Sequence, residues 1–260
     1  MAGTTAIEWT DATWNPVTGC TQVSPGCDHC YAMTLAHRRL REFYLRQDPV
    51  RTTEVARADP FAVRLWPDRV TEPLRWKASR MVFVNSMSDL FHVDVPEEYV
   101  RVLFEVMLQA ERHVFQILTK RPARAARFVR RNADLFHRGT LPEHIWLGAS
   151  VESKDALYRV DHLRSVRATT RFLSCEPLLG PIRPRLRGIH WVIAGGESGR
   201  GYRTLDLAWV RALRDQCRRA AVPFFFKQVG GYTPKAGGRL LDGVEWNEFP
   251  SVAYSRLAVA

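Results

Sequence analysis

Short apolar runs that alternate with amphipathic helical stretches constrain the fold of this chain more than any other feature. Each run is rich in β-branched or aromatic residues, ends in a small or polar cluster, and precedes a helical stretch. This repeat is typical of parallel strands joined by right-handed crossovers. The predicted strands are Ala6–Trp9, Met81–Asn85, Val114–Leu118, Ile145–Gly148, Arg171–Leu173, Trp191–Ala194 and Phe224–Phe226.

The helices predicted between these strands complete an α/β pattern. Glu97–Gln109 is the clearest, because Leu103, Val106 and Met107 recur on one face and Pro96 suits a helix start. The other predicted helices are Tyr31–Leu45, Arg121–Asn132, Lys154–Val166 and Leu207–Ala221.

Chain length and hydrophobic content limit the number of domains. The 260 residues are 46% hydrophobic, which suits one core of the size found in single α/β barrels. We therefore expect a single-domain partial TIM barrel of about six to seven parallel βα units over residues 1–260. Residues 47–77 carry four prolines and break the rhythm, so we expect an insertion there, lying over one face.

Polar and ionisable residues gather where the predicted strands end. Such groups at the carboxyl ends of successive parallel strands are typical of an active-site rim. The alternative is that they are ordinary turn residues and helix caps. All seven strand ends bear a Glu, Asp or Lys, which favours the rim. The segments are Thr10–Asp11, Ser86–Asp89, Thr119–Arg121, Ala149–Glu152, Ser174–Pro177, Gly195–Gly199 and Lys227–Gln228.

Three of the five cysteines lie in one loop with the spacing C-x6-C-x2-C, namely Cys20, Cys27 and Cys30. No targeting segment or membrane-spanning run is visible, so we expect a cytoplasmic protein whose thiols stay reduced. Three thiolates can hold three irons of a 4Fe-4S cluster and leave the fourth iron open. The alternatives are structural zinc, which needs a fourth ligand, and a redox dithiol or simple free thiols.

The charge balance bears on the partner. The chain carries 38 Lys and Arg against 27 Asp and Glu, which gives a net charge of +11. This excess favours nucleic acid, because basic surface gains free energy by releasing counterions from phosphates. The alternative is that the charge serves solubility alone. A membrane partner is not expected, since no long basic amphipathic stretch is present.

The cysteine loop, with Tyr31 beside the last cysteine, resembles that of the radical S-adenosylmethionine superfamily. More narrowly, the chain resembles a phage- and bacteria-associated three-cysteine-motif family related to spore photoproduct lyase. The superfamily's usual spacing is C-x3-C-x2-C with the aromatic residue before the last cysteine, and this chain departs from both features. The matching stretches are Ala6–Pro16, the cysteine loop, Phe172–Pro181, Gly195–Gly199 and Pro223–Gln228.

The resemblance implies a 4Fe-4S cluster and S-adenosylmethionine, whose reductive cleavage gives a 5′-deoxyadenosyl radical. It also implies an electron donor such as a flavodoxin or ferredoxin. The implied activity is that of a lyase that repairs a pyrimidine photolesion in DNA. The alternatives are radical modification of RNA or of a small molecule, and a non-catalytic, phage-associated nucleic-acid-binding adaptor with a structural cluster or zinc.

Roles for individual residues follow from the resemblance. Cys175 is the candidate hydrogen-atom donor, and Tyr31 is the second catalytic candidate. Side chains alternate along a strand, so only one of Ser174 and Cys175 can face the barrel interior; the alternative for Cys175 is a small buried hydrophobe. The implied cofactor-binding residues are Ser86, Ser88, Asp89, Lys120, Ser150, Glu152, Ser174, Glu176, Gly195, Gly196 and Glu197.

Overall fold

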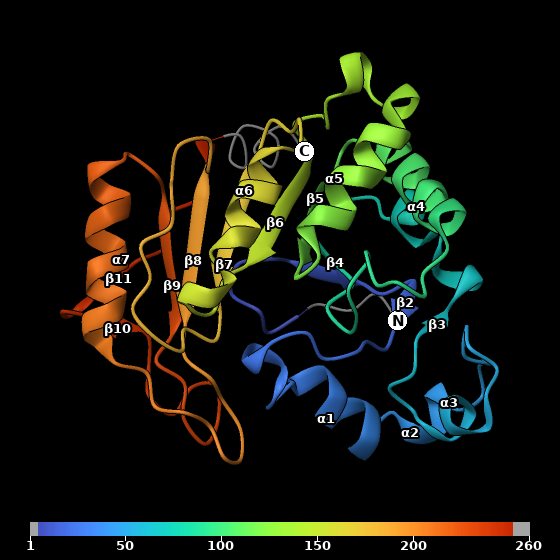
Figure 1. The fold of residues 1–260 in the computed structure, drawn as a ribbon, viewed down its shortest axis with the longest axis horizontal. Helices are drawn as coiled ribbons and strands as arrows, with labels where there is room; N and C mark the ends of the chain where they lie inside the picture. The colour runs from blue at the N-terminus through green and yellow to red at the C-terminus, as the bar shows by residue number, and fades with distance from the viewer. Residues whose placement is uncertain (1–4, 252–260) are drawn as a thin grey trace.

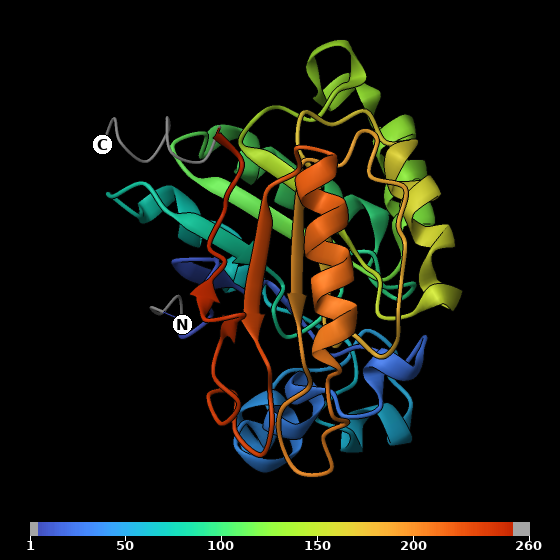
Figure 2. The ribbon, with the colours of Figure 1, turned by 90° about the vertical axis from the view of Figure 1, so that its left-hand side faces the viewer.

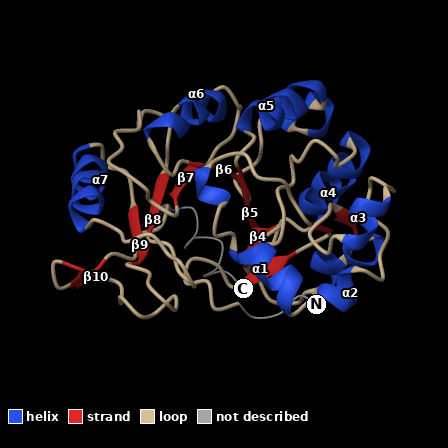
Figure 3. Ribbon diagram, turned by 60° about the horizontal axis from the view of Figure 1, so that its bottom comes forward, coloured by secondary structure: helices blue, strands red, loops and turns tan. Residues whose placement is uncertain are grey.

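Seven parallel strands form the centre of the computed structural model, which describes residues 5–251. The sheet curls so that its helices lie outside the arc (Figures 1 and 3). The α/β partial TIM barrel expected from the sequence is confirmed. In order across the sheet, the strands are β1 (Ala12–Trp14), β4 (Met81–Val84), β5 (Val114–Thr119), β6 (Ile145–Ser150), β7 (Arg171–Cys175), β8 (Trp191–Gly195) and β9 (Phe224–Gln228).

Four helices cover the convex face of the sheet (Figure 3). The helix predicted after Pro96 is confirmed at both ends as α4. The helix predicted over Lys154–Val166 is shorter, because residues 154–156 form a 3-10 turn instead. The four helices are α4 (Glu97–Gln109), α5 (Pro122–Arg131), α6 (Tyr158–Arg164) and α7 (Leu207–Arg219).

The first strand is not the predicted Ala6–Trp9, which forms a turn; it is β1. Two side chains just before β1 bind the start of β4. Thr10 Oγ1 donates to the Met81 carbonyl oxygen at 3.0 Å, and Asp11 accepts from the Met81 N–H at 2.8 Å. Thr10 and Asp11 therefore lie at the amino-terminal edge of the sheet, and the expectation that they belong to the active-site rim is wrong.

The two faces of the sheet bury different side chains. The convex face packs mainly aliphatic residues, with Phe115, Phe224 and Phe226, against the helices, whereas the concave face carries a layer of aromatic rings near the amino ends of the strands. Side chains alternate along each strand, so Gly148, Ser150 and Ser174 lie further along on the same concave face. The aromatic layer comprises Trp9, Phe83, Trp146, Phe172, Trp191, Phe225 and Phe249.

A smaller group of elements lies beyond the carboxyl ends of the strands (Figures 1 and 2). The helix predicted over Tyr31–Leu45 breaks into α1 (Tyr31–Arg38) and α2 (Arg41–Tyr44). Residues 47–77 contain α3 (Glu54–Ala58) and β3 (Arg64–Leu65). The latter pairs with β2 (Val17–Thr18) just before the first cysteine.

Two short strands near the end of the described chain, β10 (Leu240–Leu241) and β11 (Val244–Glu245), form a hairpin. Within residues 5–251, no helix has both the length and the apolar character needed to cross a membrane.

The close approach of β6 and β7 on the concave face gives a test of this packing. A Cβ at Gly148 would lie 2.4 Å from Cζ of Phe172. We expect Gly148→Ala to lower the free energy of unfolding by about 1–3 kcal/mol, because the Phe172 ring must move. Urea denaturation measures the change, with Gly180→Ala as control, since no atom lies within 4 Å of a Cβ there. Equal midpoints for the two variants would contradict this packing.

Candidate functional site

The first cysteine is held by backbone contacts at the carboxyl end of the sheet. The Cys20 N–H donates to the Phe61 carbonyl oxygen at 3.1 Å, and the Gly19 N–H donates to the Met87 carbonyl oxygen at 3.0 Å. Gly19 has a φ of +85°, and a Cβ there would lie 2.1 Å from the Ala62 carbonyl oxygen. Only glycine fits this approach, so Gly19 determines where Cys20 leaves the β2 segment.

The other two cysteines belong to one compact turn. Cys27 ends a 3-10 turn over Pro25–Cys27, and its N–H donates to the Ser24 carbonyl oxygen at 2.9 Å. Cys30 is the N-cap of α1, and its N–H donates to the Cys27 carbonyl oxygen at 3.2 Å. All three thiols of the cysteine loop are free and partly buried.

The cysteine loop is the candidate donor set for a bound metal group. Within residues 5–251, no three His, Cys, Asp or Glu side chains are arranged to hold a metal ion, so the thiols share a loop without yet surrounding one point. The other two cysteines, Cys175 and Cys217, are fully buried in the core between sheet and helices. They cannot add a fourth thiolate, so the donor set fits a three-thiolate iron–sulfur cluster better than a four-cysteine zinc site.

Arg121, at the end of β5, reaches the first cysteine. Its Nη1 lies 3.6 Å from the Cys20 Sγ and 3.1 Å from Asp89 Oδ2. Burial, together with the charge of Asp89, raises the pKa of the Cys20 thiol to about 11, although Arg121 acts in the opposite direction. Without a bound metal group, Cys20 is therefore protonated at neutral pH.

Asp89 has no acceptor capacity left for a ligand. Its carboxylate accepts from the Phe91 N–H at 2.9 Å, Thr119 Oγ1 at 2.7 Å, the Lys120 N–H at 3.0 Å and Arg121 at 3.1 Å. A carboxylate offers about four such positions. These contacts occupy the carboxylate of Asp89, which the resemblance implies as a cofactor-binding residue.

The neighbouring serines are also engaged within the protein. Ser86 Oγ donates to Asn15 Oδ1 at 3.2 Å, and Ser88 Oγ donates to the Val17 carbonyl oxygen at 2.9 Å. Both contacts join the end of β4 to the segment that leads into the cysteine loop. They give Ser86 and Ser88 a structural role in addition to any contact with a cofactor.

Glu152 is buried at the end of β6, beside the cysteine loop, where a Cβ at Gly26 would lie 3.0 Å from its Cγ. Its side chain is fully buried, and its Oε2 accepts from Arg159 Nη1 at 2.8 Å, while Arg159 also donates to the Ser150 carbonyl oxygen at 2.9 Å. Arg159 belongs to α6, so this ion pair joins the end of β6 to its following helix. Glu152 thus has a structural role, while its Oε1 has no hydrogen-bond partner within residues 5–251 and its predicted cofactor role stays a prediction.

Glu197, in the loop after β8, binds the cysteine loop. Its carboxylate is 5% exposed and accepts from Arg203 at 2.6 and 3.0 Å and from His29 Nδ1 at 2.8 Å. Burial by itself raises the pKa of Glu197, but the hydrogen bonds from Arg203 and His29 outweigh it and lower the pKa to about 2. These hydrogen bonds therefore occupy the Glu197 carboxylate, which was predicted to bind the cofactor.

The two glycines before Glu197 are explained by their protein neighbours. A Cβ at Gly196 would lie 1.9 Å from the Val229 carbonyl oxygen, and one at Gly195 would lie 2.9 Å from Glu176 Oε1. Gly196 thus permits the loop after β8 to approach the loop after β9. Gly195 leaves room on the concave face beside Glu176.

A polar cluster on the concave face remains open to a ligand. Glu176 Oε1 pairs with Lys227 Nζ at 3.1 Å, and Ser174 Oγ lies 3.3 Å from Glu176 Oε2. Ser150 and Gly195 occupy the matching concave positions of β6 and β8. Lys120 stands at the end of β5, and its ammonium has no partner within residues 5–251.

The two catalytic candidates occupy different environments. Cys175 is fully buried on the convex side among core residues, where burial raises its thiol pKa well above the ordinary value. Ser174 faces the concave side instead, so the placement favours the buried-hydrophobe alternative for Cys175. Tyr31 is 51% exposed at the start of α1, and its hydroxyl donates to the Ser86 carbonyl oxygen. Tyr31 therefore remains a candidate residue of the functional site.

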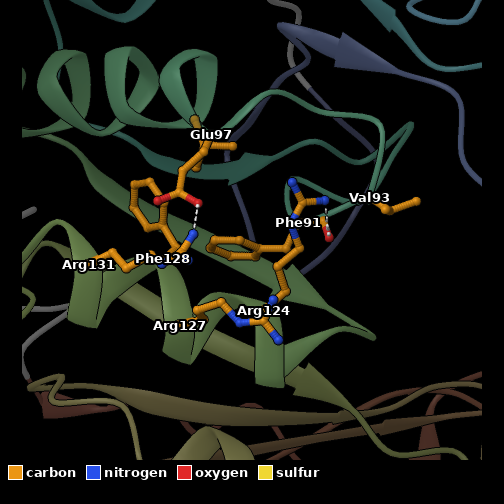
Figure 4. Close-up of a pocket in the computed structure, with 8 residues that line it drawn as sticks. Phe91, Val93, Glu97, Arg124, Arg127, Phe128 and Arg131 are labelled. Carbon is orange, nitrogen blue, oxygen red and sulfur yellow. Dashed lines mark hydrogen bonds and ion pairs between the residues drawn. The ribbon is translucent and has the colours of Figure 1, made fainter.

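A basic groove of about 290 Å³ lies between α5 and the start of α4 (Figure 4). Arg124 donates to the backbone carbonyls of residues 91, 92 and 95, and Arg131 pairs with Glu97 at 3.4 Å. Arg127 is exposed and has no partner in the described part of the chain. The remaining lining residues are Phe91, Val93, Val100 and Phe128.

Comparison with known proteins identifies the family. The match to the family described as "Protein of unknown function (DUF5131)" extends over residues 4–250. The chain belongs to the DUF5131 family. No curated protein matches this DUF5131 chain.

Three solved structures of spore photoproduct lyase are similar to the DUF5131 chain. The complex with a dinucleoside spore photoproduct has a TM-score of 0.47 at 11% identity and covers 84% of this chain. A tyrosine-to-phenylalanine variant gives 0.44 at 11% and 84%, and a cysteine-to-alanine variant gives 0.43 at 12% and 89%. The chain spans 64%, 64% and 78% of these proteins, respectively.

Two arginines at the site were missed by sequence reasoning. Arg203 binds the cysteine loop and Arg159 binds the end of β6, yet neither lies in a recognisable motif. The contact of Arg159 could have been predicted from the sequence, because Arg159 lies on a helix only seven residues after Glu152. Arg203 had no such signal, because its partners Pro25 and Asp28 are distant in sequence.

The buried pair of Glu152 and Arg159 gives a stability test. We expect Arg159→Met to lower the free energy of unfolding by about 3–5 kcal/mol, because it leaves a buried carboxylate without its partner. The double variant Glu152→Gln/Arg159→Met should recover most of that loss. Denaturant unfolding measures both, and a single variant as stable as the unmodified protein would contradict the assigned pair.

Proposed function

We propose that this protein is a radical S-adenosylmethionine enzyme that acts on nucleic acid. In this proposal, Cys20, Cys27 and Cys30 hold a 4Fe-4S cluster at the open end of the half-barrel. The observation that carries the proposal is the position of the cysteine loop across the carboxyl ends of the strands. The loop contacts the end of β4 through Tyr31, the end of β5 through Arg121 and the end of β8 through Glu197.

The three thiolates would leave one iron free for the amino and carboxylate groups of S-adenosylmethionine. When bound, the cluster supplies the electron that cleaves the sulfonium, delivered by a flavodoxin- or ferredoxin-like donor. The protein's part is to orient the cofactor and exclude water. The concave polar cluster supports this role, because it offers both acceptors and a cation beside the aromatic layer.

Specific contacts can be proposed for the residues that remain open. Ser174 and Glu176 offer acceptors suited to ribose hydroxyls, and Ser150 lies on the adjacent strand. Lys120 and Lys227 offer cations suited to a carboxylate or a phosphate. Asp89 and Glu197 are left out, because their carboxylates are occupied within the protein. Glu152 is left out because its side chain is fully buried and paired with Arg159.

The basic surface supports nucleic acid as the substrate class. The net charge of +11 is accompanied by the basic groove along α5, in which Arg127 is available to phosphate. Repair of a pyrimidine photolesion is the activity we propose to test first. Such a reaction would use a hydrogen-atom donor other than Cys175, since that thiol faces the convex core.

The cluster can be tested directly on anaerobically purified protein. We expect brown protein with iron and sulfide near the 4Fe-4S ratio. Alanine at Cys20, Cys27 or Cys30 should abolish the colour and the iron, because each removes one thiolate ligand. Cys217→Ala is the matched control and should keep both, since Cys217 lies in the convex core. Colourless protein with stoichiometric zinc would overturn the cluster.

Cofactor cleavage separates an enzyme from an adaptor. Reduced, cluster-loaded protein should convert S-adenosylmethionine into 5′-deoxyadenosine, measured by chromatography. Oligonucleotides with and without a pyrimidine photolesion, and matched RNA, then distinguish the substrates. A stable cluster without 5′-deoxyadenosine would favour a nucleic-acid-binding adaptor.

Nucleic-acid binding should depend steeply on salt, because each phosphate contact releases counterions. We expect Arg127→Ala to weaken DNA binding and to reduce the slope of log affinity against log salt by about one. The control is Arg211→Ala. Arg211 lies on α7 and its guanidinium pairs with Asp242 at 2.7 Å, so this substitution should leave the slope unchanged. Undetectable binding at low salt, or affinity that is flat across the series, would exclude a nucleic-acid partner.

A further inference from the structure

Six residues separate Cys20 from Cys27, and both ends of this gap loop (residues 21–26) are held by arginines from the rim of the sheet. At the first end, Arg121 Nη2 donates to the Thr21 carbonyl oxygen and to its Oγ1, both at 3.1 Å. Its Nη1 reaches the Cys20 Sγ at 3.6 Å. One guanidinium thus binds two successive residues of the cysteine loop.

At the second end, Arg203 makes the corresponding contacts. Its Nη2 donates to the Pro25 carbonyl oxygen at 2.9 Å, and its Nη1 donates to Asp28 at 3.3 Å. These residues flank Cys27 on both sides. His29, the next residue along, donates from Nδ1 to Glu197 Oε2 at 2.8 Å.

Each arginine is itself immobilised by a carboxylate that is almost fully buried. Asp89, 8% exposed, holds Arg121, and Glu197, 5% exposed, holds Arg203 through two donors. A planar guanidinium bound in this way keeps one orientation and can present its other N–H groups to a fixed acceptor. The two pairs therefore place Thr21 and Pro25 relative to the ends of β5 and β8.

We propose that Arg121 and Arg203 are positioning residues that hold the gap loop and thereby set Cys20 relative to Cys27 and Cys30. A longer gap between ligands has more conformations to lose on closing, and the two arginines restrict those conformations before any metal binds. Asp89 and Glu197 act through these arginines and not on a cofactor. The restraint of the loop stands on the contacts alone, whereas its consequence for the cluster rests on the proposed function.

Hydrogen–deuterium exchange of the metal-free protein tests the restraint. We expect Arg203→Ala to speed amide exchange in residues 24–29 by about tenfold, because a charge-assisted contact to the backbone is lost. Arg121→Ala should act instead on residues 20–22. Arg203→Lys, which keeps the charge but not the fork of donors, should give an intermediate rate. The control Arg211→Ala should change neither segment.

The exchange rates test the positioning role of the two arginines, and the iron content tests the proposed function. Loop exchange that is unchanged in both alanine variants, or that rises equally over β5 to β8, would overturn the positioning role. Iron content after reconstitution should fall in both alanine variants and in Glu197→Gln. If the unmodified protein binds no iron, the proposed function is wrong. The exchange rates still decide whether the two arginines restrain the loop.

Discussion

A buried carboxylate at the end of β4 joins the parts of this protein on which the site depends. Asp89 accepts from the backbone beyond β4, from the last residue of β5, and from Arg121, which in turn reaches Cys20. Because those donors replace water around a buried charge, the removal of any one leaves part of that charge unsatisfied. The sheet edge and the cysteine loop are thus stabilised by the same group.

The same arrangement recurs across the sheet. Glu152 joins β6 to α6 through Arg159, and Glu197 joins the loop after β8 to the cysteine loop through Arg203. The carboxylates of Asp89, Glu152 and Glu197 contribute to the architecture, while Glu176 lies on the concave face beside Lys227. The candidate ligand contacts on the concave face therefore lie between the ends of β5 and β9.

Much of the fold followed from the sequence because parallel strands buried on both sides appear as continuous apolar runs. Six of the seven strands and the full extent of α4 were predicted in this way. The first strand was misplaced, since Ala6–Trp9 and Ala12–Trp14 are both apolar and aromatic. Only the pairing with β4 and the contacts of Thr10 and Asp11 with Met81 distinguish them.

The sequence alone determined the parallel α/β repeat, the three-cysteine loop and the polar strand ends, because these are patterns of neighbouring residues. Tertiary structure decided which of the polar residues are free. Asp89 and Glu197 resemble ligand-binding acids in the sequence. The arginine that binds Asp89 comes from the next strand end, 32 positions away, and the histidine that binds Glu197 comes from the cysteine loop, 168 positions away. Whether a carboxylate serves a ligand or the protein depends on which donors reach it, and those distances exist only once the sheet has curled.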